Sequence, residues 1–202
     1  MDNQMKLLLE SWRKYLNEVE MQDATMLSIF DFDETIAFTT SYADAFDKDT
    51  GEFVKRIYSQ KEQDAAKDSG LYDLDFSSYD DVEAPMEVTS VTKKLRDRIA
   101  DPRVQVMVLT ARAARSEDDI HRYLGTLDPP IDTSELLIKG LAGANKGEFT
   151  LSVLERYPNF KSVEFLDDSD KNLRDMKAAS EKRPDVDFAI YKAYEGTINQ
   201  IE

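Results

Sequence analysis

The feature that most constrains the fold is a regular alternation of short apolar runs and helical patterns over the second half of the chain. Apolar runs at 26–30, 104–109, 136–138, 163–166 and 187–191 predict strands, and periodic stretches at 87–100, 116–125, 147–157 and 170–182 predict helices. Strands that alternate with helices form right-handed βαβ units around a parallel sheet. We therefore expect an α/β fold, a three-layer α/β/α sandwich with a five-stranded parallel sheet.

The length and composition fit one such domain with a modest insertion. The chain has 202 residues, of which 41% are hydrophobic, enough to bury a real core. We assign residues 1–22 to an N-terminal amphipathic helix and residues 23–202 to the core, which an insertion at about 38–86 interrupts. That insertion lacks a long periodicity and is rich in acids. We expect it to be partly helical over 41–66, irregular afterwards, and placed over the sheet as a small cap.

Charge and cysteine content exclude several classes of function. The net charge is −15, which repels polyanions, so extended binding to a nucleic-acid duplex is not expected. The chain has no Cys, which excludes disulfides, Cys-ligated zinc and thiol catalysis and suits a reducing compartment. No apolar run has the length of a membrane span or of a signal-peptide core. We expect a cytoplasmic protein with no membrane partner.

Polar residues suited to catalysis follow three of the predicted strands. These are Asp31-Phe32-Asp33-Glu34-Thr35, Thr110-Ala111-Arg112 and Asp167-Asp168, and Lys146 precedes a helix after a further strand. Ligands of open parallel sheets bind beyond the carboxyl ends of the strands. We therefore expect these side chains to meet in one site.

The residue types in this set suit phosphate chemistry. Asp31, Asp33, Asp167 and Asp168 would repel one another unless a cation lay among them, and a shell of carboxylates without Cys favours Mg²⁺. Asp31 is then placed to attack phosphorus, while Asp33 is placed to protonate the leaving oxygen and later to activate water. The Thr110 hydroxyl and the Lys146 ammonium would bind the phosphoryl oxygens.

The order Asp31-x-Asp33-x-Thr35, Thr110, Lys146, Asp167-Asp168 resembles that of the haloacid dehalogenase superfamily, whose members are mostly Mg²⁺-dependent phosphatases. The resemblance covers the chain outside the N-terminal helix and the insertion. It implies a Rossmann-like core, Asp31 as the nucleophile that forms an aspartyl-phosphate, and Asp33 as the general acid and base. It also implies that the metal is held at Asp31, at the backbone carbonyl of Asp33 and by a carboxylate of the Asp167-Asp168 pair, with the choice within that pair left open.

Two shorter motifs resemble a narrower group within the superfamily. Thr110-Ala111-Arg112 and Leu166-Asp167-Asp168 are similar to motifs in the phosphatase domains of phage polynucleotide kinase/phosphatases and in RNA-repair-type domains. This likeness implies that Arg112 binds phosphate, together with Thr35, Thr110 and Lys146. The expected substrate is a small phosphorylated metabolite, a nucleotide or the terminal phosphate of a nucleic acid. A phage origin would place the protein in the host cytoplasm.

Each of these residues also has a structural interpretation. Asp31 and Asp33 could lie in a solvated turn, Lys146 could be a surface lysine, Arg112 could pair with a surface carboxylate, and Asp168 could cap a helix. At the level of function, the alternatives are a receiver-like domain and an inactive phosphate-binding module. In a receiver the paired acids come early and a lone Asp accepts phosphate in mid-chain, whereas here the acid pair comes last.

Overall fold

The computed structural model describes residues 24–134 and 136–201 and has a mostly parallel central sheet. Its strands are β1 (Met26–Phe30), β7 (Val104–Thr110), β8 (Leu137–Gly140), β9 (Ser162–Asp167), β10 (Asp187–Tyr194) and β11 (Thr197–Ile201), in the order β11-β10-β9-β1-β7-β8. The first five are parallel, at the places expected from the sequence. The predicted α/β class is therefore confirmed.

The expected total of five strands is wrong, because the chain turns back after β10. Glu195 and Gly196 both have positive φ, at 46° and 79°, which is the backbone of a tight two-residue hairpin turn. The turn adds β11 antiparallel to β10 at the edge of the sheet. The Glu-Gly pair, followed by Thr and Ile, was the signal for this hairpin in the sequence.

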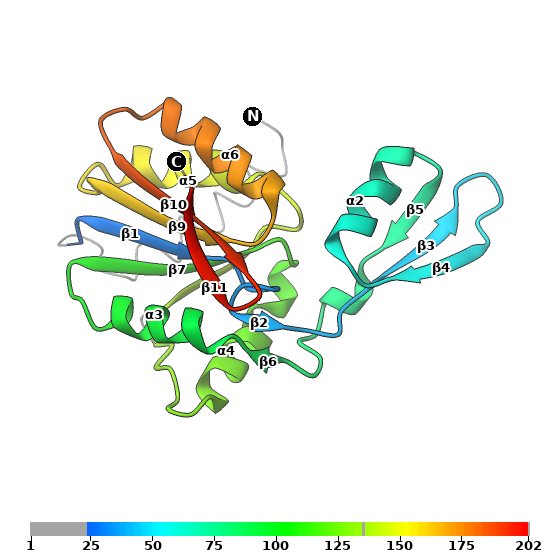
Figure 1. The fold of residues 1–202 in the computed structure, drawn as a ribbon, viewed down its shortest axis with the longest axis horizontal. Coiled ribbons are helices and arrows are strands. Elements are labelled where there is room, and N and C mark those ends of the chain that lie inside the picture. Colours follow the sequence, from blue (N-terminus) through cyan, green and yellow to red (C-terminus); the bar gives the residue numbers. More distant parts are fainter. Residues whose placement is uncertain (1–23, 135, 202) are drawn as a thin grey trace.

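Helices cover both faces of the sheet (Figure 1). They are α3 (Thr89–Ile99), α4 (Glu117–Thr126), α5 (Lys146–Arg156) and α6 (Asp170–Glu181), and each predicted helix is confirmed to within two residues at either end. α3 and α4 lie on one face and α5 and α6 on the other. Separate apolar clusters fill the two faces, one around Phe30, Leu95 and Leu124, the other around Ile29, Phe149 and Phe165.

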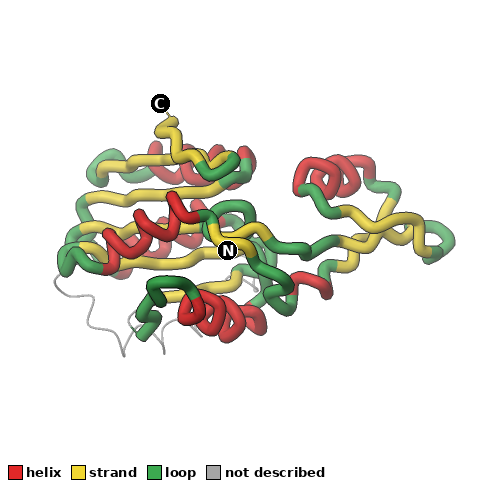
Figure 2. Tube along the Cα trace, turned by 60° about the horizontal axis from the view of Figure 1, so that its bottom comes forward, coloured by secondary structure: helices red, strands yellow, loops and turns green. Residues whose placement is uncertain are grey.

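A second lobe projects beyond the carboxyl ends of the parallel strands (Figures 1 and 2). It contains β3 (Ala43–Asp47), β4 (Phe53–Ile57), β5 (Tyr72–Asp75), helix α2 (Gln60–Ser69) and the short 3₁₀ helix η1 (Ser77–Tyr79). The three strands form an antiparallel sheet in the order β4-β3-β5. A two-stranded ribbon of β2 (Ala37–Phe38) and β6 (Met86–Glu87) carries the chain out to this lobe and back.

The expectation that the insertion is partly helical over 41–66 holds only for the start of α2, and the irregular structure expected afterwards is wrong, because β5 follows. Residues 43–57 form a β-hairpin, the helix covers only 60–69, and a strand follows it. The hairpin turn is closed by Asp47, whose carboxylate accepts hydrogen bonds from the backbone N–H groups of Asp49 and Thr50, and by Gly51 with φ 72°. The β-forming run Phe53-Val54 after this turn was the sequence signal that favoured a hairpin over a helix.

The amphipathic helix predicted within 1–22 lies outside the described residues. Among the helices of the described part, none has the length and apolarity needed to cross a membrane.

Candidate active site

The register of the central strands brings Asp31 and Asp167 side by side. Phe30 pairs with Val108 on one side and with Leu166 on the other, and the Asp31 N–H donates to the Leu166 carbonyl over 2.8 Å. Asp31 therefore follows β1 at the same level at which Asp167 ends β9. Both carboxylates are buried, and the solvated-turn interpretation of Asp31 is wrong.

Lys146 lies between these two carboxylates. It is the first residue of α5, and its ammonium donates to Asp31 Oδ1 over 2.5 Å and to Asp167 Oδ2 over 2.7 Å. Only 1% of its surface is exposed, so the surface-lysine interpretation is wrong. The N-cap residue Asn145, whose side chain accepts from the Glu148 N–H, fixes where α5 begins and so places Lys146.

Burial and like charges perturb the acids of this cluster. Burial raises the pKa of Asp31 to about 7 despite Lys146, and Asp167 and Asp33 add to the rise. Burial together with the charges of Asp31 and Asp167 raises the pKa of Asp168 to about 9. For Lys146, burial favours the neutral form, but Asp167 and Asp31 outweigh it and raise the pKa of the ammonium. Full ionisation of Asp31 and Asp168 would therefore need a cation in addition to the Lys146 ammonium.

Asp31, Asp167 and Asp168 form a group that could hold a metal ion. One carboxylate oxygen from each lies within 4.8 Å of the other two. When all three carboxylates are ionised, they and the one ammonium leave two negative charges without a counter-charge, which matches a divalent cation. An all-oxygen donor set fits a hard ion such as Mg²⁺. The Asp33 side chain is not in this group, and the resemblance to the haloacid dehalogenase superfamily implied only its backbone carbonyl as a metal ligand.

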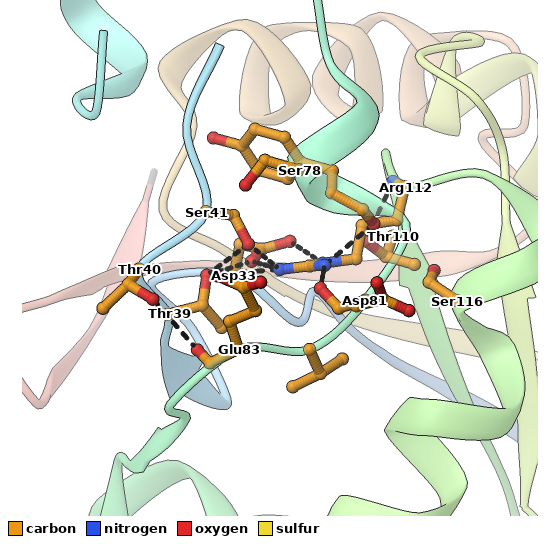
Figure 3. A network of polar contacts seen from close by, with 12 residues as sticks. Asp33, Thr39, Thr40, Ser41, Ser78, Asp81, Glu83, Thr110, Arg112 and Ser116 are labelled. Atoms are coloured by element: carbon orange, nitrogen blue, oxygen red, sulfur yellow. Dashed lines mark hydrogen bonds and ion pairs between the residues drawn. The ribbon is translucent and has the colours of Figure 1, made fainter. Parts of the chain in front are cut away.

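The Asp33 carboxylate is held instead by Arg112 (Figure 3). The guanidinium of Arg112 donates through Nε to Asp33 Oδ2 over 2.8 Å and through Nη2 to Asp33 Oδ1 over 2.7 Å. Its Nη1 donates to the carbonyls of Tyr79 and Asp81, and Nη2 also reaches Ser41 Oγ. These contacts occupy the N–H groups that phosphate binding would need. Arg112 thus pairs with a carboxylate inside the protein and not with a surface carboxylate, and its assignment to phosphate stays a prediction.

The two threonines of the sequence motifs are buried below the site. Thr110 ends β7, and its Oγ1 accepts from the Arg112 N–H over 3.1 Å. Thr35 is also buried, and its Oγ1 has no hydrogen-bond partner among the described residues. Neither residue lines the pocket described next, so their assignment to phosphate stays a prediction.

A pocket of about 710 Å³ lies between the central sheet and the lobe. Asp31, Asp33 and Asp168 line it from the sheet side, and Gln63, Lys67 and Phe76 line it from the lobe. Glu34 also faces it, with φ 56° in the tight turn after β1, and burial with the nearby Asp33 raises the pKa of Glu34. The acids whose pKa values are raised, Asp31, Glu34 and Asp168, therefore line this pocket.

Sequence reasoning missed three polar residues of this region. The Asn172 amide donates to both oxygens of Asp167 at 3.1 Å, from the first turn of α6. Thr39 donates to Asp33 Oδ1 over 3.0 Å, and Ser41 lies beside it. Asn172 follows Asp167 by five residues across a strand end and helix start, a spacing that signals such a contact. Thr39 and Ser41 carried no signal, because they lie in the connection from β2 out to the lobe, and the path of that connection depends on the folded lobe.

The comparisons with known proteins leave the function open. Residues 138–199 match a family model described as "Protein of unknown function (DUF2608)", which covers α5, β9, α6 and β10 and less than half of the chain. A comparison with curated proteins and one with solved structures gave no match.

Proposed function

We propose that this chain is a Mg²⁺-dependent phosphomonoester hydrolase of the haloacid dehalogenase type, with Asp31 as its nucleophile. The observation that carries the proposal is the buried cluster in which Lys146 bridges Asp31 and Asp167 while Asp168 lies within metal-binding distance. Asp31 lines a pocket, and its pKa is raised to about 7 by burial and by neighbouring acids. Such a perturbed acid in a pocket is typical of catalytic sites.

Asp31, Asp167 and Asp168 would hold the metal ion. Bound there, Mg²⁺ would neutralise charge on the phosphoryl oxygens and keep the carboxylates ionised. Asn172 and the Ser169 N–H orient Asp167 by hydrogen bonds to its carboxylate, as the supporting shell of a metal site does.

The reaction would proceed in two steps on Asp31. A carboxylate oxygen of Asp31 bonds to phosphorus as the bond to the leaving oxygen breaks, and Asp33 gives its proton to that oxygen. Water then attacks the aspartyl-phosphate, Asp33 takes a proton from it, and inorganic phosphate leaves with the Asp31 carboxylate restored. Lys146 holds Asp31 in place through both steps, because its second bond to Asp167 fixes the ammonium.

The pocket favours a compact substrate. Its volume of about 710 Å³ admits a nucleotide or sugar phosphate, whose leaving group would lie against Lys67 and Phe76 of the lobe. Acids crowd residues 62–87, which disfavours a long polyanion across the same surface. A single terminal phosphate of a nucleic acid remains compatible with this charge.

The test is hydrolysis of p-nitrophenyl phosphate by the purified chain. We expect turnover with Mg²⁺, none in excess chelator, and restoration when Mg²⁺ is added back. Asp31→Asn should lower kcat at least about a thousandfold, whereas Asp170→Asn, an exposed acid paired with Lys192 outside the pocket, should leave kcat unchanged. Full activity in chelator, or no hydrolysis across aryl, sugar and nucleotide phosphates, would contradict the proposal and favour a receiver-like or inactive module.

A further inference from the structure

Arg112 is a buried charge whose partners come from three separate segments of the chain. Its side chain has no exposed surface. It extends from just beyond the end of β7 in the central sheet and bonds to Asp33 in the turn after β1. The same guanidinium donates to Ser41 Oγ over 2.8 Å and to the carbonyls of Tyr79 and Asp81 over 2.9 and 2.7 Å.

Two of these segments are the connections between the sheet and the lobe. Ser41 lies in the outgoing connection between β2 and β3, and Tyr79 and Asp81 lie where the chain returns toward β6. Figure 3 shows the guanidinium among Asp33, Ser41 and Asp81. One side chain thus joins Asp33 to both connections, so the position of Asp33 depends on where the lobe is held.

The contacts orient the Asp33 carboxylate but do not occupy all of its lone pairs. A carboxylate offers about four lone-pair sites. Asp33 Oδ1 accepts from Arg112 and Thr39, whereas Oδ2 accepts only from Arg112 Nε among the described residues. Asp33 also lines the pocket, so Oδ2 keeps a lone pair for a leaving oxygen or a water molecule.

We infer that Arg112 is a positioning residue that fixes the Asp33 carboxylate for proton transfer and makes this position depend on the two connections to the lobe. The inference rests on the proposed role of Asp33 as general acid and base. Lysine cannot replace Arg112 here, because a single ammonium lacks the planar fork that grips both carboxylate oxygens and reaches two carbonyls.

The test compares leaving groups, since a mispositioned acid matters most when the leaving oxygen is basic. For Arg112→Lys we expect kcat/KM to fall about a hundredfold for an alkyl phosphate and less than about tenfold for 2,4-dinitrophenyl phosphate, whose leaving group needs no proton. The matched control is Arg56→Lys, which alters an exposed two-pronged pair with Asp44 in the lobe, outside the pocket. It should change neither value.

A second variant keeps the inference testable if Arg112→Lys does not fold. Thr39→Val combined with Ser41→Ala leaves the Arg112–Asp33 pair in place and removes the side-chain bonds of the outgoing connection. It should show the same selective loss for the alkyl phosphate, at about tenfold. If the wild type hydrolyses both phosphates, an equal loss of kcat/KM for both leaving groups, or no loss, would overturn this inference and leave the proposed function standing. No hydrolysis by the wild type would overturn the proposed function, and this inference with it.

Discussion

Two buried carboxylates, Glu164 in β9 and Asp31 just after the neighbouring strand β1, behave in opposite ways, and their partners explain why. Glu164 on β9 accepts from Ser28 and Arg98 and pairs with Lys94 at 2.6 Å. Burial alone would raise the pKa of Glu164, but the hydrogen bonds from Arg98, Lys94 and Ser28 overcome it and lower the pKa to about 2. Asp31 shares Lys146 with Asp167, and the pKa of Asp31 is raised. Two cations thus hold the single carboxylate of Glu164 in its structural network, whereas two carboxylates share one ammonium at the site.

The pKa of Glu164 sets a pH dependence of stability. Because the pKa is lowered in the folded state, the stabilisation is complete above the unfolded value of about 4.5 and is lost as the pH falls toward 2. Glu164→Gln should therefore lower the free energy of unfolding by about 3 kcal/mol at neutral pH, a difference that shrinks below about pH 4. Urea unfolding at several pH values measures it.

Asp185→Asn is the control for this variant, because its exposed pair with Arg183 also lowers the pKa of an acid to about 2 without burying it. It should leave the unfolding free energy unchanged. If the two substitutions lowered the free energy of unfolding equally, the stabilisation by the Glu164 network would not depend on its burial.

At the scale of elements, the site depends on how closely α5 approaches α6. A Cβ on Gly147 would lie 2.3 Å from the backbone carbonyl oxygen of Asp175 in α6, so only glycine permits this approach. Gly147 directly follows Lys146 in the first turn of α5. The packing of the two helices therefore determines where the ammonium meets Asp31 and Asp167.

Gly147→Ala should push α5 away from α6 and displace Lys146. We expect a loss of about 1–3 kcal/mol in stability, as for overpacked sites, together with a lower kcat. Gly125→Ala is the matched control, since Gly125 lies within α4 and a Cβ there meets no atom within 4 Å. It should stabilise the protein by about 0.5–1 kcal/mol and leave kcat unchanged. Thermal unfolding and p-nitrophenyl phosphate kinetics of both variants decide the matter.

At the scale of the whole molecule, the central sheet supplies the buried acid cluster, and the lobe forms the opposite wall of the pocket. The acids meet at the carboxyl ends of the parallel strands, and the lobe adds residues such as Gln63 and Phe76 to the same pocket. The Arg112 side chain connects the two parts, because it bonds both to Asp33 and to the connection that returns from the lobe. The site is therefore a product of the assembled fold and not of one segment.

The sequence predicted the parts of this arrangement that depend on local periodicity. The parallel strands, the four helices over them and the convergence of Asp31, Lys146 and Asp167 follow from apolar patterns and from where strands end. The sequence could not predict that Arg112 turns inward, because its partners Ser41, Tyr79 and Asp81 come from connections whose path depends on the folded lobe. The lobe hairpin was missed because its strands have only five residues each and β4 is mostly exposed, so it lacks a clear alternation of apolar and polar residues.

The most direct test of the central claim is to trap the covalent intermediate. The chain would be mixed with a phosphomonoester and Mg²⁺, quenched in acid, and treated with borohydride, which reduces an aspartyl-phosphate to homoserine. Peptide mass spectrometry then locates the modified residue. We predict homoserine at position 31 alone, and only when substrate and Mg²⁺ are both present. Rapid phosphate release with an unmodified Asp31, or with the modification at another acid, would contradict the account.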